Sequence, residues 1–267
     1  MPALPAPERV VKVSELFDLT GRVAIVTGGG SGIGRQMAEG LAETGADLVL
    51  CARHLDRCER AAEELRAHGV RTLALRCDVR DQAEVESVVE RTRSELGRID
   101  VLVNNSGTVW GAWPEDTPLE GWQKVVDVNL TGTFLFSQAA GRVMIAEGGG
   151  KIVNIASIAA LKGMRPEIMN TIAYNATKGG IISFTRDLAC KWARHGITVN
   201  AIAPGWFPSE LSKPVLDEHA DELADQIPLR RLGGPDDLKG AIVYLASRAS
   251  DYVTGQTLVV DGGQSAW

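Results

Sequence analysis

Short apolar runs alternate with longer segments of helical spacing along most of this chain. Residues 22–27 and 46–52 are almost continuously apolar, which is typical of strands buried on both faces of a parallel sheet. Runs of this kind predict strands at residues 22–27, 46–52, 72–76, 100–103, 151–156, 198–203 and 257–260. Strands separated by helix-length segments indicate βαβ units, so the pattern predicts an α/β fold with a doubly wound, parallel seven-stranded sheet.

The segments between these runs carry apolar residues at helical spacing, as Met37, Ala38 and Leu41 illustrate. Helices on both faces of the sheet are therefore expected at residues 34–44, 55–67, 82–96, 119–147, 174–193 and 236–245. Two stretches, 158–172 and 205–234, show no clear pattern and are assigned no element. We expect residues 1–20 to form an N-terminal arm and residues 21–267 to form one domain.

Composition excludes several classes of protein. The 28 Lys and Arg residues are outnumbered by 34 Asp and Glu residues, for a net charge of -6, which argues against a nucleic-acid partner. No apolar run approaches the roughly 20 residues that span a bilayer, so no membrane is expected. The cysteines Cys51, Cys58, Cys77 and Cys190 lack CxxC spacing, which indicates structural thiols and no metal site. The N-terminus lacks a signal-peptide pattern, so a cytoplasmic location is expected.

A glycine-rich turn lies directly between the first predicted strand and the first predicted helix. Residues 27–34 read Thr-Gly-Gly-Gly-Ser-Gly-Ile-Gly. A turn in this place can hold a dinucleotide pyrophosphate on free backbone N–H groups and on the positive end of the helix dipole. The alternative is a merely flexible connection, but its place after the first strand of a βαβ series favours nucleotide binding in a single Rossmann-type domain.

The end of the second predicted strand bears on the type of cofactor. A site for NAD(H) would place Asp or Glu about 20 residues after the glycines, where it binds the ribose 2′-hydroxyl. This strand instead ends in Ala52-Arg53-His54, with no acid until Asp56. Arg53 could pair with a 2′-phosphate, so NADP(H) is favoured over NAD(H), although an ordinary solvated arginine is the alternative.

Three later residues can support proton transfer at a carbonyl. Tyr174 and Lys178 are spaced i, i+4, so they project from one face of a predicted helix. A nearby ammonium group favours the phenolate and is expected to lower the pKa of the tyrosine. Such a phenol can donate or accept a proton as hydride moves to or from a carbonyl carbon. Ser157, at the end of a predicted strand, could donate a hydrogen bond to the same oxygen.

These motifs together resemble the short-chain dehydrogenase/reductase family in its compact single-domain form. The resemblance runs from about Leu19 to Gly263 and rests on residues 27–34, Asn104-Asn105-Ser106-Gly107, Asn129, Ser157, Tyr174–Lys178, Pro204-Gly205 and the closing residues 255–263. It implies an oxidoreductase that interconverts a ketone and a secondary alcohol. Ser106 replaces the alanine common in the family, a small change that should leave cofactor binding intact.

The resemblance also implies roles for individual residues. Asn129, Ser157, Tyr174 and Lys178 would form the catalytic tetrad, with Tyr174 as acid/base and Asn129 holding a water molecule. Cofactor contacts would come from Gly28, Ser31, Gly32, Ile33, Gly34, Arg53, Asp78, Val79, Asn105, Gly107, Tyr174, Lys178, Pro204, Gly205 and Phe207. The assembly implied is a homotetramer, with the helices of Asn129 and Tyr174 at one interface and the C-terminal strand at another. Small residues such as Gly141 and Gly179 would permit close helix approach.

The substrate is expected to be shaped by an insertion. Between Ser157 and Tyr174 stand 16 residues, a few more than is usual in the family. Candidate substrate contacts are Trp110, Arg165 and Trp206; aromatics with a few polar groups suit many small ligands. Arg165 could clamp a carboxylate, although a solvated arginine and packing tryptophans are the alternatives.

Two substrate classes and one non-catalytic function compete. Several segments look similar to gluconate 5-dehydrogenase-like members, which favours a keto-sugar acid such as 5-ketogluconate. The closing motifs look equally like 3-oxoacyl-[acyl-carrier-protein] reductases, and a general carbonyl reductase is a related alternative. Gly148 and His195 stand where those reductases carry basic carrier-docking residues, which lowers that alternative. A catalytically inactive NADP(H)-binding sensor should lack part of the tetrad, yet all four residues are present.

Overall fold

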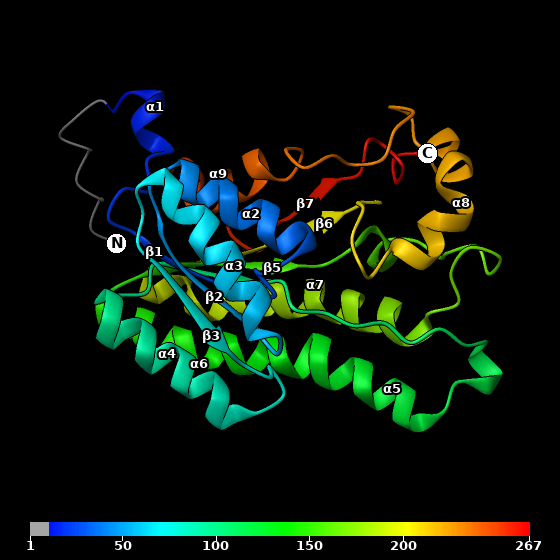
Figure 1. The fold of residues 1–267 in the computed structure, drawn as a ribbon, viewed down its shortest axis with the longest axis horizontal. Coiled ribbons are helices and arrows are strands. Elements are labelled where there is room, and N and C mark those ends of the chain that lie inside the picture. The colour runs from blue at the N-terminus through cyan, green and yellow to red at the C-terminus, as the bar shows by residue number, and fades with distance from the viewer. Residues whose placement is uncertain (1–10) are drawn as a thin grey trace.

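A parallel sheet of seven strands forms the centre of the molecule (Figure 1). The computed structural model describes residues 11–267. The strand order is β3-β2-β1-β4-β5-β6-β7, and every pair of neighbours is parallel. The strands are β1 (Val23–Thr27), β2 (Asp47–Ala52), β3 (Thr72–Arg76), β4 (Val101–Asn104), β5 (Gly150–Ile155), β6 (Ile197–Pro204) and β7 (Thr257–Val260). The α/β fold predicted from the apolar runs is therefore confirmed.

Helices cover both faces of this sheet (Figure 1). They are α1 (Val13–Leu16), α2 (Gly32–Glu43), α3 (Leu55–Leu65), α4 (Gln82–Leu96), α5 (Leu119–Val126), α6 (Gly132–Glu147), α7 (Ile172–Trp192), α8 (Lys213–Gln226) and α9 (Lys239–Ala246). Helices α2, α3 and α9 lie on one face, and α4, α6 and α7 lie on the other. No helix among residues 11–267 is both long enough and apolar enough to cross a bilayer.

Successive residues of the central strands serve the two halves of the core. In β1, Ala24 and Val26 pack with Met37 and Leu41 of α2. Ile25, between them, packs on the other face with Phe136 of α6. All six residues are fully buried. This alternation explains why the strands are continuously apolar, since a strand covered on both faces has no side for solvent.

Several predicted boundaries shift. Helix α2 begins at Gly32, two residues before the predicted start, and α9 begins at Lys239 instead of residue 236. The helix expected over 119–147 is interrupted by a π-helical turn, Asp127–Thr131. The unassigned stretch 205–234 contains α8, a helix with a largely charged surface. Of the expected arm, residues 1–10 lie outside the described part of the chain, and α1 lies within the rest.

The chain adds strands to one side of β1 first and to its other side afterwards, so the point where this order switches lies between β1 and β4. From β1 the chain runs outward through β2 and β3, then returns to pair β4 with the other side of β1. The connections that leave the carboxyl ends of these two strands therefore diverge onto opposite faces. A crevice at such a switch point is the usual ligand site of open parallel sheets.

We expect Phe136→Ala to lower the free energy of unfolding by about 3–5 kcal/mol, because it removes a fully buried ring and leaves a cavity. Urea denaturation followed by circular dichroism measures the change. Leu119, which is 78% exposed, is the control: Leu119→Ala should shift the value by no more than about 0.5 kcal/mol. Equal effects of the two substitutions would contradict this description of the core.

Candidate functional site

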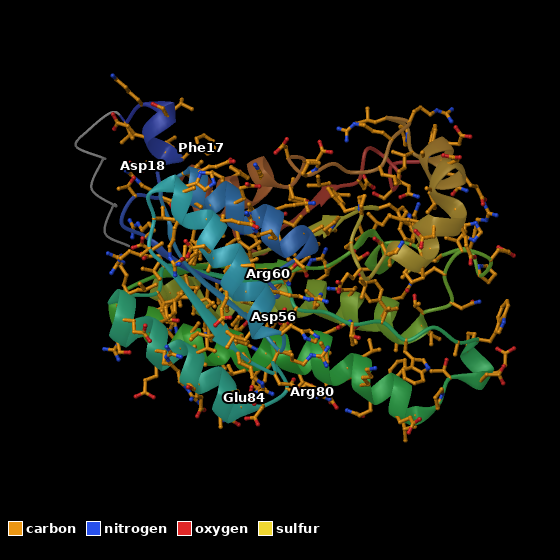
Figure 2. The ribbon with its side chains drawn as sticks, in the orientation of Figure 1. Phe17, Asp18, Asp56, Arg60, Arg80 and Glu84 are labelled. Carbon is orange, nitrogen blue, oxygen red and sulfur yellow. The ribbon has the colours of Figure 1, made fainter. Side chains whose placement is uncertain are left out.

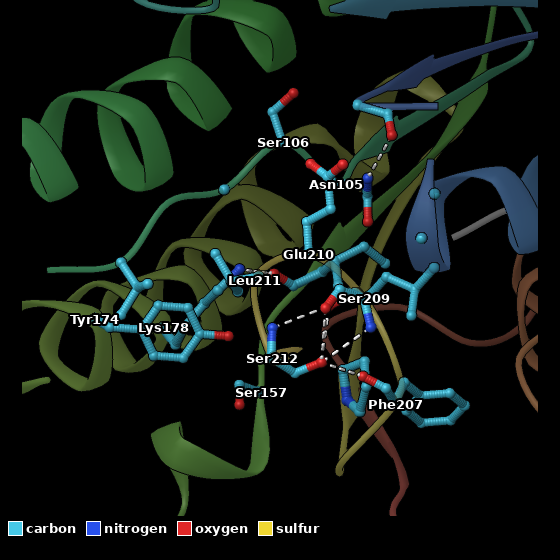
Figure 3. A pocket seen from close by; sticks show the side chains of 18 of the residues that line it. Asn105, Ser106, Ser157, Tyr174, Lys178, Phe207, Ser209, Glu210, Leu211 and Ser212 are labelled. Atoms are coloured by element: carbon cyan, nitrogen blue, oxygen red, sulfur yellow. Dashed lines mark hydrogen bonds between the residues drawn. The ribbon is translucent and has the colours of Figure 1, made fainter. Parts of the chain in front are cut away.

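One cavity of about 650 Å³ opens at the carboxyl ends of the strands. It extends from the start of α3 to the start of α8, and Figure 3 shows part of its wall. Every residue predicted to contact a cofactor lines this cavity, as do Ser157 and Trp206. The predicted site residues therefore come from distant parts of the chain to one place, at the switch point between β1 and β4.

The glycine-rich turn packs too closely to accommodate side chains. Gly28 and Gly32 have φ of +67° and +53°, a region that glycine adopts without strain. A Cβ on Gly34 would overlap the carbonyl oxygen of Gly28 and the amide nitrogen of Asn105. Ser31, the residue before α2, makes no side-chain cap, so the first N–H groups of the helix are left for another acceptor. Such a helix start is suited to binding an anion.

The connection after β4 is fastened to this turn. The hydroxyl of Thr27 accepts hydrogen bonds from the backbone N–H groups of Asn105 and Ser106, each at 2.9 Å. The side-chain amide of Asn105 donates to the carbonyl of Thr27 at 2.9 Å. Gly107 follows at the cavity wall. The two connections thus form a single braced rim, in which Thr27 is a structural residue that sequence reasoning did not single out.

The end of the cavity beside β2 carries charge. Arg53 is exposed there, and no salt bridge involves it among the described residues. Asp78, after β3, is held by Arg80 at 2.6 Å and donates its backbone N–H to Glu84 at 2.7 Å; Figure 2 labels Arg80 and Glu84. The hydrogen bond from Arg80 lowers the pKa of Asp78, against the effect of burial. This end therefore presents a cationic side chain next to a firmly held carboxylate.

The sequence did not indicate Arg57 or the ion pair that it makes at this end. Arg57, in the first turns of α3, pairs with Glu210 at 2.6 Å, and both line the cavity. Glu210 belongs to the segment 207–212, in which the Ser212 hydroxyl donates to the Phe207 carbonyl at 2.6 Å (Figure 3). The ion pair ties this segment to α3 across the cavity mouth. Since 153 positions separate the partners, no local pattern could have indicated the pair.

Ser157, Tyr174 and Lys178 meet at the middle of the cavity. Tyr174 and Lys178 lie side by side on α7 (Figure 3), with the ammonium 5.5 Å from the ring centre. Lys178 is 4% exposed and donates to the carbonyl of Ile155 at 2.6 Å. The Ser157 hydroxyl accepts from the backbone N–H of Ala159 at 3.1 Å, which leaves its proton free to be donated into the cavity.

The expected fall in the tyrosine pKa does not occur in this structure. Burial raises the pKa of Tyr174, and a hydrogen bond with Ser157 lowers it only in part. Burial also lowers the pKa of Lys178 to about 8, because the ammonium is removed from water. The predicted fall rests on the attraction between the two groups, whereas the cost of burying both dominates their pKa values. At neutral pH the phenol is therefore protonated and the amine is charged.

Asn129 lies behind this group and outside the cavity wall. It is fully buried in the π-helical turn. Its amide oxygen accepts a hydrogen bond from the Thr108 N–H at 2.8 Å. Its amide nitrogen donates to the Thr108 carbonyl at 3.0 Å and to the Thr177 hydroxyl at 3.1 Å. A Cβ placed on Gly107 would lie within 4 Å of both the Asn129 oxygen and Lys178 Nζ. Asn129 therefore braces the connection after β4, and both Asn129 and Lys178 lie close to Gly107.

Of the three residues predicted to contact the substrate, one lines the cavity and two do not. Trp206 lines the cavity and is 8% exposed. Trp110 does not line it, because its indole packs over Gly121, where a Cβ would lie 2.6 Å from the ring. Arg165 also points elsewhere, since it pairs with Glu222 at 2.7 Å and with Glu167 at 3.7 Å. The contacts predicted for Trp110 and Arg165 are corrected accordingly: both are occupied by partners outside the cavity.

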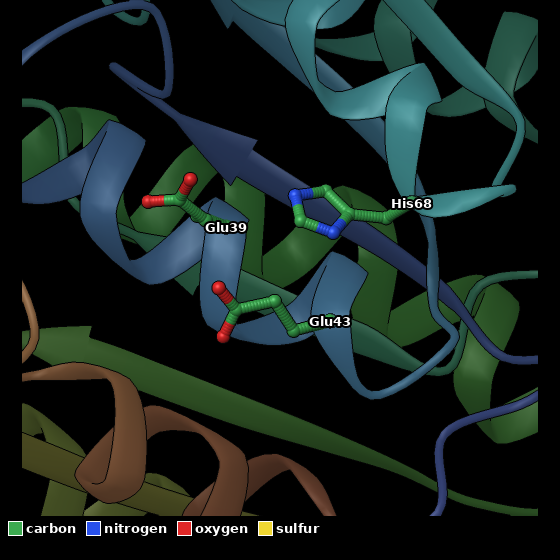
Figure 4. A group of neighbouring side chains, drawn as sticks. All are labelled: Glu39, Glu43 and His68. Carbon is green, nitrogen blue, oxygen red and sulfur yellow. The ribbon is translucent and has the colours of Figure 1, made fainter.

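A separate group, Glu39, Glu43 and His68, lies between α2 and the end of α3 (Figure 4). The spacing of its side-chain atoms could hold a metal ion. Both carboxylates already bind Lys239 of α9, at 3.3 and 2.8 Å, and these contacts raise the pKa of that lysine. We interpret the group as an ion-pair cluster that joins α2 to α9.

Comparisons with known proteins agree with this geometry. A family model described as Enoyl-(Acyl carrier protein) reductase matches residues 28–265. The 2-dehydro-3-deoxy-D-gluconate 5-dehydrogenase of Escherichia coli (strain K12) is 40% identical over 250 residues, covering 92% of this chain and 96% of the relative.

Two solved structures superpose closely. A short-chain type dehydrogenase/reductase from Mycobacterium marinum has a TM-score of 0.91 and 38% identity, over 95% of this chain and 99% of that one. A gluconate 5-dehydrogenase from Burkholderia cenocepacia J2315, in complex with NADP and tartrate, has a TM-score of 0.90 and 38% identity, over 96% and 100% of the two chains.

Burial of Lys178 predicts a pH-dependent contribution to stability. Its pKa is about 8 in the folded chain and about 10.4 when unfolded, so between these values the unfolded state binds more protons. Stability must therefore rise with pH in this window and stay unchanged below pH 7. Relative to Lys178→Met, the native protein should gain about 2 kcal/mol of unfolding free energy between pH 7 and pH 10. Urea titrations at each pH measure this; a constant difference would show that the ammonium is not desolvated.

Proposed function

The chain belongs to the short-chain dehydrogenase/reductase family, and from that premise we propose that its cavity binds NADP(H) and interconverts a ketone and a secondary alcohol by hydride transfer. One observation carries the proposal: the glycine-rich turn and the group Ser157, Tyr174 and Lys178 line the same cavity. A nucleotide held on the turn would extend toward the tyrosine, where a carbonyl group can be placed.

The residues present fit a dinucleotide. The turn leaves a cradle that a Cβ on Gly28 or Gly34 would fill, and the start of α2 has uncapped N–H groups for a pyrophosphate. Arg53 faces the same cavity at the end of β2, where no acidic residue stands to bind a ribose 2′-hydroxyl. This charge supports NADP(H) over NAD(H), as does the NADP bound to the related gluconate 5-dehydrogenase.

Reduction requires a proton at the carbonyl oxygen, and Tyr174 is placed to donate it. The nicotinamide supplies the hydride when bound. Because burial raises the pKa of Tyr174, the phenol keeps its proton until an acceptor of developing negative charge lies beside it. The Ser157 hydroxyl donates a second hydrogen bond to the same oxygen and stabilises that charge. In the oxidation direction the two roles reverse, and Tyr174 accepts the proton.

Lys178 and Asn129 support the tyrosine from behind. The Lys178 ammonium, held by the Ile155 carbonyl, is positioned to stabilise the phenolate that remains after proton transfer and to contact the nicotinamide ribose. Asn129 fixes the connection that carries Gly107 and Thr108, and we assign to it the holding of a water molecule beside Lys178. Both assignments follow from the family resemblance and are consistent with the contacts described above.

For the substrate, the names of relatives support a keto-sugar acid such as 5-ketogluconate, since the relatives from E. coli and B. cenocepacia are both gluconate-type dehydrogenases. A 3-oxoacyl or general carbonyl substrate is the second candidate. Carrier-protein docking has less support, because Gly148 ends α6 without a side chain and His195 accepts a hydrogen bond from Arg194. A non-catalytic NADP(H) sensor has the least support, since Ser157, Tyr174 and Lys178 are all in place.

The proposal includes a homotetramer, a cytoplasmic location, and division into an arm, residues 1–20, and one domain, residues 21–267. Exposed Phe134 on α6 and exposed Leu258 and Val259 on β7 support two apolar interfaces. Gly179 has open space beside it, as close helix approach requires. Gly141 does not, because Trp192 of the same chain occupies that space.

Tyr174→Phe should reduce NADPH-linked ketone reduction by at least about 1,000-fold, because it removes only the acid that protonates the carbonyl. Initial rates of NADPH oxidation measure the loss. Binding of NADPH, followed by its fluorescence, should remain within about threefold of the native value, because the ring still fills its buried position. Substantial turnover by the variant would refute the role of Tyr174.

Arg53→Ala should weaken NADPH binding by about 10–100-fold, because a charge-assisted contact to the 2′-phosphate is lost. NADH binding should barely change, since NADH lacks that phosphate. Titrations of both cofactors test this, with the exposed arginine Arg60→Ala, which does not line the cavity, as the matched control. An equal effect on NADPH and NADH would exclude a selective role for Arg53.

A further inference from the structure

The part of the cavity beyond Tyr174 has a wall of different character from the rest. We call it the substrate chamber, and it is bounded by Val109, Met164, Ile168, Met169, Trp206 and Val215. Three of these belong to the insertion before Tyr174, and they pack with Trp206 and with residues of α8. The insertion therefore contributes an apolar wall, formed by two methionines and an isoleucine.

The charged residues that line the cavity lie elsewhere. Arg53, Arg57, Asp78 and Glu210 belong to the end beside β2 or to the ion pair across the mouth. The buried ammonium of Lys178 donates to the Ile155 carbonyl, beside the tyrosine. Within residues 11–267, the substrate chamber itself is lined by no arginine or lysine.

Cations on the segments around the chamber are bound to other partners. Lys162 of the insertion donates to the Gln264 carbonyl at 3.0 Å. Arg165 pairs with Glu222, and Lys213, at the start of α8, pairs with Asp217 at 2.8 Å. None of these three lines the cavity. A carboxylate in the chamber would therefore lose its hydration without gaining a paired charge.

Polar side chains in the chamber are few, and most already have partners. Thr171 donates to Asn175 at 3.2 Å, and Ser212 donates to Phe207. The Trp206 indole N–H is buried without an acceptor, so it does not reach the open cavity. Among residues 11–267, this leaves the amide of Asn170 as the polar side chain next to the chamber's apolar wall besides Ser157 and Tyr174, since Asn105 and Ser106 line the cavity beside the glycine-rich turn. A polyhydroxylated chain would bury several hydroxyl groups there without hydrogen bonds, each at a cost.

We infer that the chamber selects an uncharged ketone with an apolar body over a keto acid or a keto-sugar acid, so its lining favours the second substrate candidate, a general carbonyl compound, over the keto-sugar acid that the names of the relatives support. This inference rests on the proposed function, since Tyr174 and Ser157 take the carbonyl oxygen. The apolar part of the ketone then lies against Met164, Met169 and Trp206, and Asn170 can meet one polar group. The apolar wall favours an apolar ketone through the hydrophobic effect. Carboxylates are disfavoured because no cation of the chamber can pair with them.

The test compares two ketones that share one ring, methyl 4-oxocyclohexanecarboxylate and the free acid 4-oxocyclohexanecarboxylate, with 5-ketogluconate as a third substrate. Initial rates of NADPH oxidation at pH 7 give kcat/KM for each. We expect the ester to exceed both acids by at least about 100-fold, because an unpaired carboxylate is costly to desolvate. Tyr174→Phe serves as the blank.

Two variants locate the cause. Met169→Arg places a cation on the chamber wall and should shift the ratio of ester to acid by at least about 10-fold toward the acid. Arg165→Ala, on the same insertion but outside the cavity, should leave the ratio unchanged. If Arg165→Ala instead lowers kcat/KM for the acids alone, Arg165 clamps their carboxylate and the inference is overturned. Because Arg165 is exposed, this result does not depend on whether Met169→Arg folds.

The outcomes separate the inference from the proposed function. Reduction of either acid as efficiently as the ester overturns the inference and leaves NADPH-linked ketone reduction standing. Binding of NADPH without turnover of any ketone, or of the corresponding alcohols with NADP⁺, refutes the proposed function, and the inference falls with it. An ester preference that Met169→Arg reduces by at least about 10-fold supports both.

Discussion

The close contact between Gly28 and Gly34 determines how the rest of the site is arranged. The carbonyl oxygen of Gly28 and the amide of Asn105 occupy the space that a Cβ of Gly34 would take. Only without side chains here can α2 begin this close to β1 and direct its uncapped N–H groups into the crevice. The same packing brings the connection after β4 against the turn, where Thr27 fastens it. Cofactor cradle and catalytic rim are thus parts of one packed unit.

The proposed proton transfer depends on a second constraint, the burial of a phenol and an ammonium within about one turn of helix. Burial favours the neutral form of each group, which raises the pKa of Tyr174 and lowers that of Lys178. The two pKa values, which are nearly equal in water, therefore move apart, so the phenol keeps its proton while the ammonium is the first of the two to lose one as the pH rises. The Ile155 carbonyl keeps the lysine in place. Ile155 is the last residue of β5, and Ser157 follows two positions later. This strand therefore positions both the Lys178 ammonium and the Ser157 hydroxyl.

Local patterns in the sequence predicted most of the fold and the cofactor end of the site. Buried strands are continuously apolar, and the glycines and the Tyr174–Lys178 pair are motifs of contiguous residues, so each can be read without knowing the fold. Helix α8 was missed because its surface is mostly charged and few of its residues are buried. Arg165 was misplaced because its partner Glu222 lies 57 positions away. Interactions between distant segments, and the cost of burial, are what a linear pattern cannot show.

The cavity separates two kinds of selectivity along its length. On the proposed function, the exposed Arg53 at the end beside β2 acts on the cofactor and distinguishes a phosphate from a hydroxyl at little cost in desolvation. Beyond Tyr174 the wall is apolar, and selection depends on shape and on the absence of a paired charge. The segment 207–212 joins the two ends, since Glu210 pairs with Arg57 while Trp206, which precedes it, lines the chamber. Any movement of this segment must therefore alter the cofactor end and the substrate wall together, so the two selectivities are not independent even though their chemistry differs.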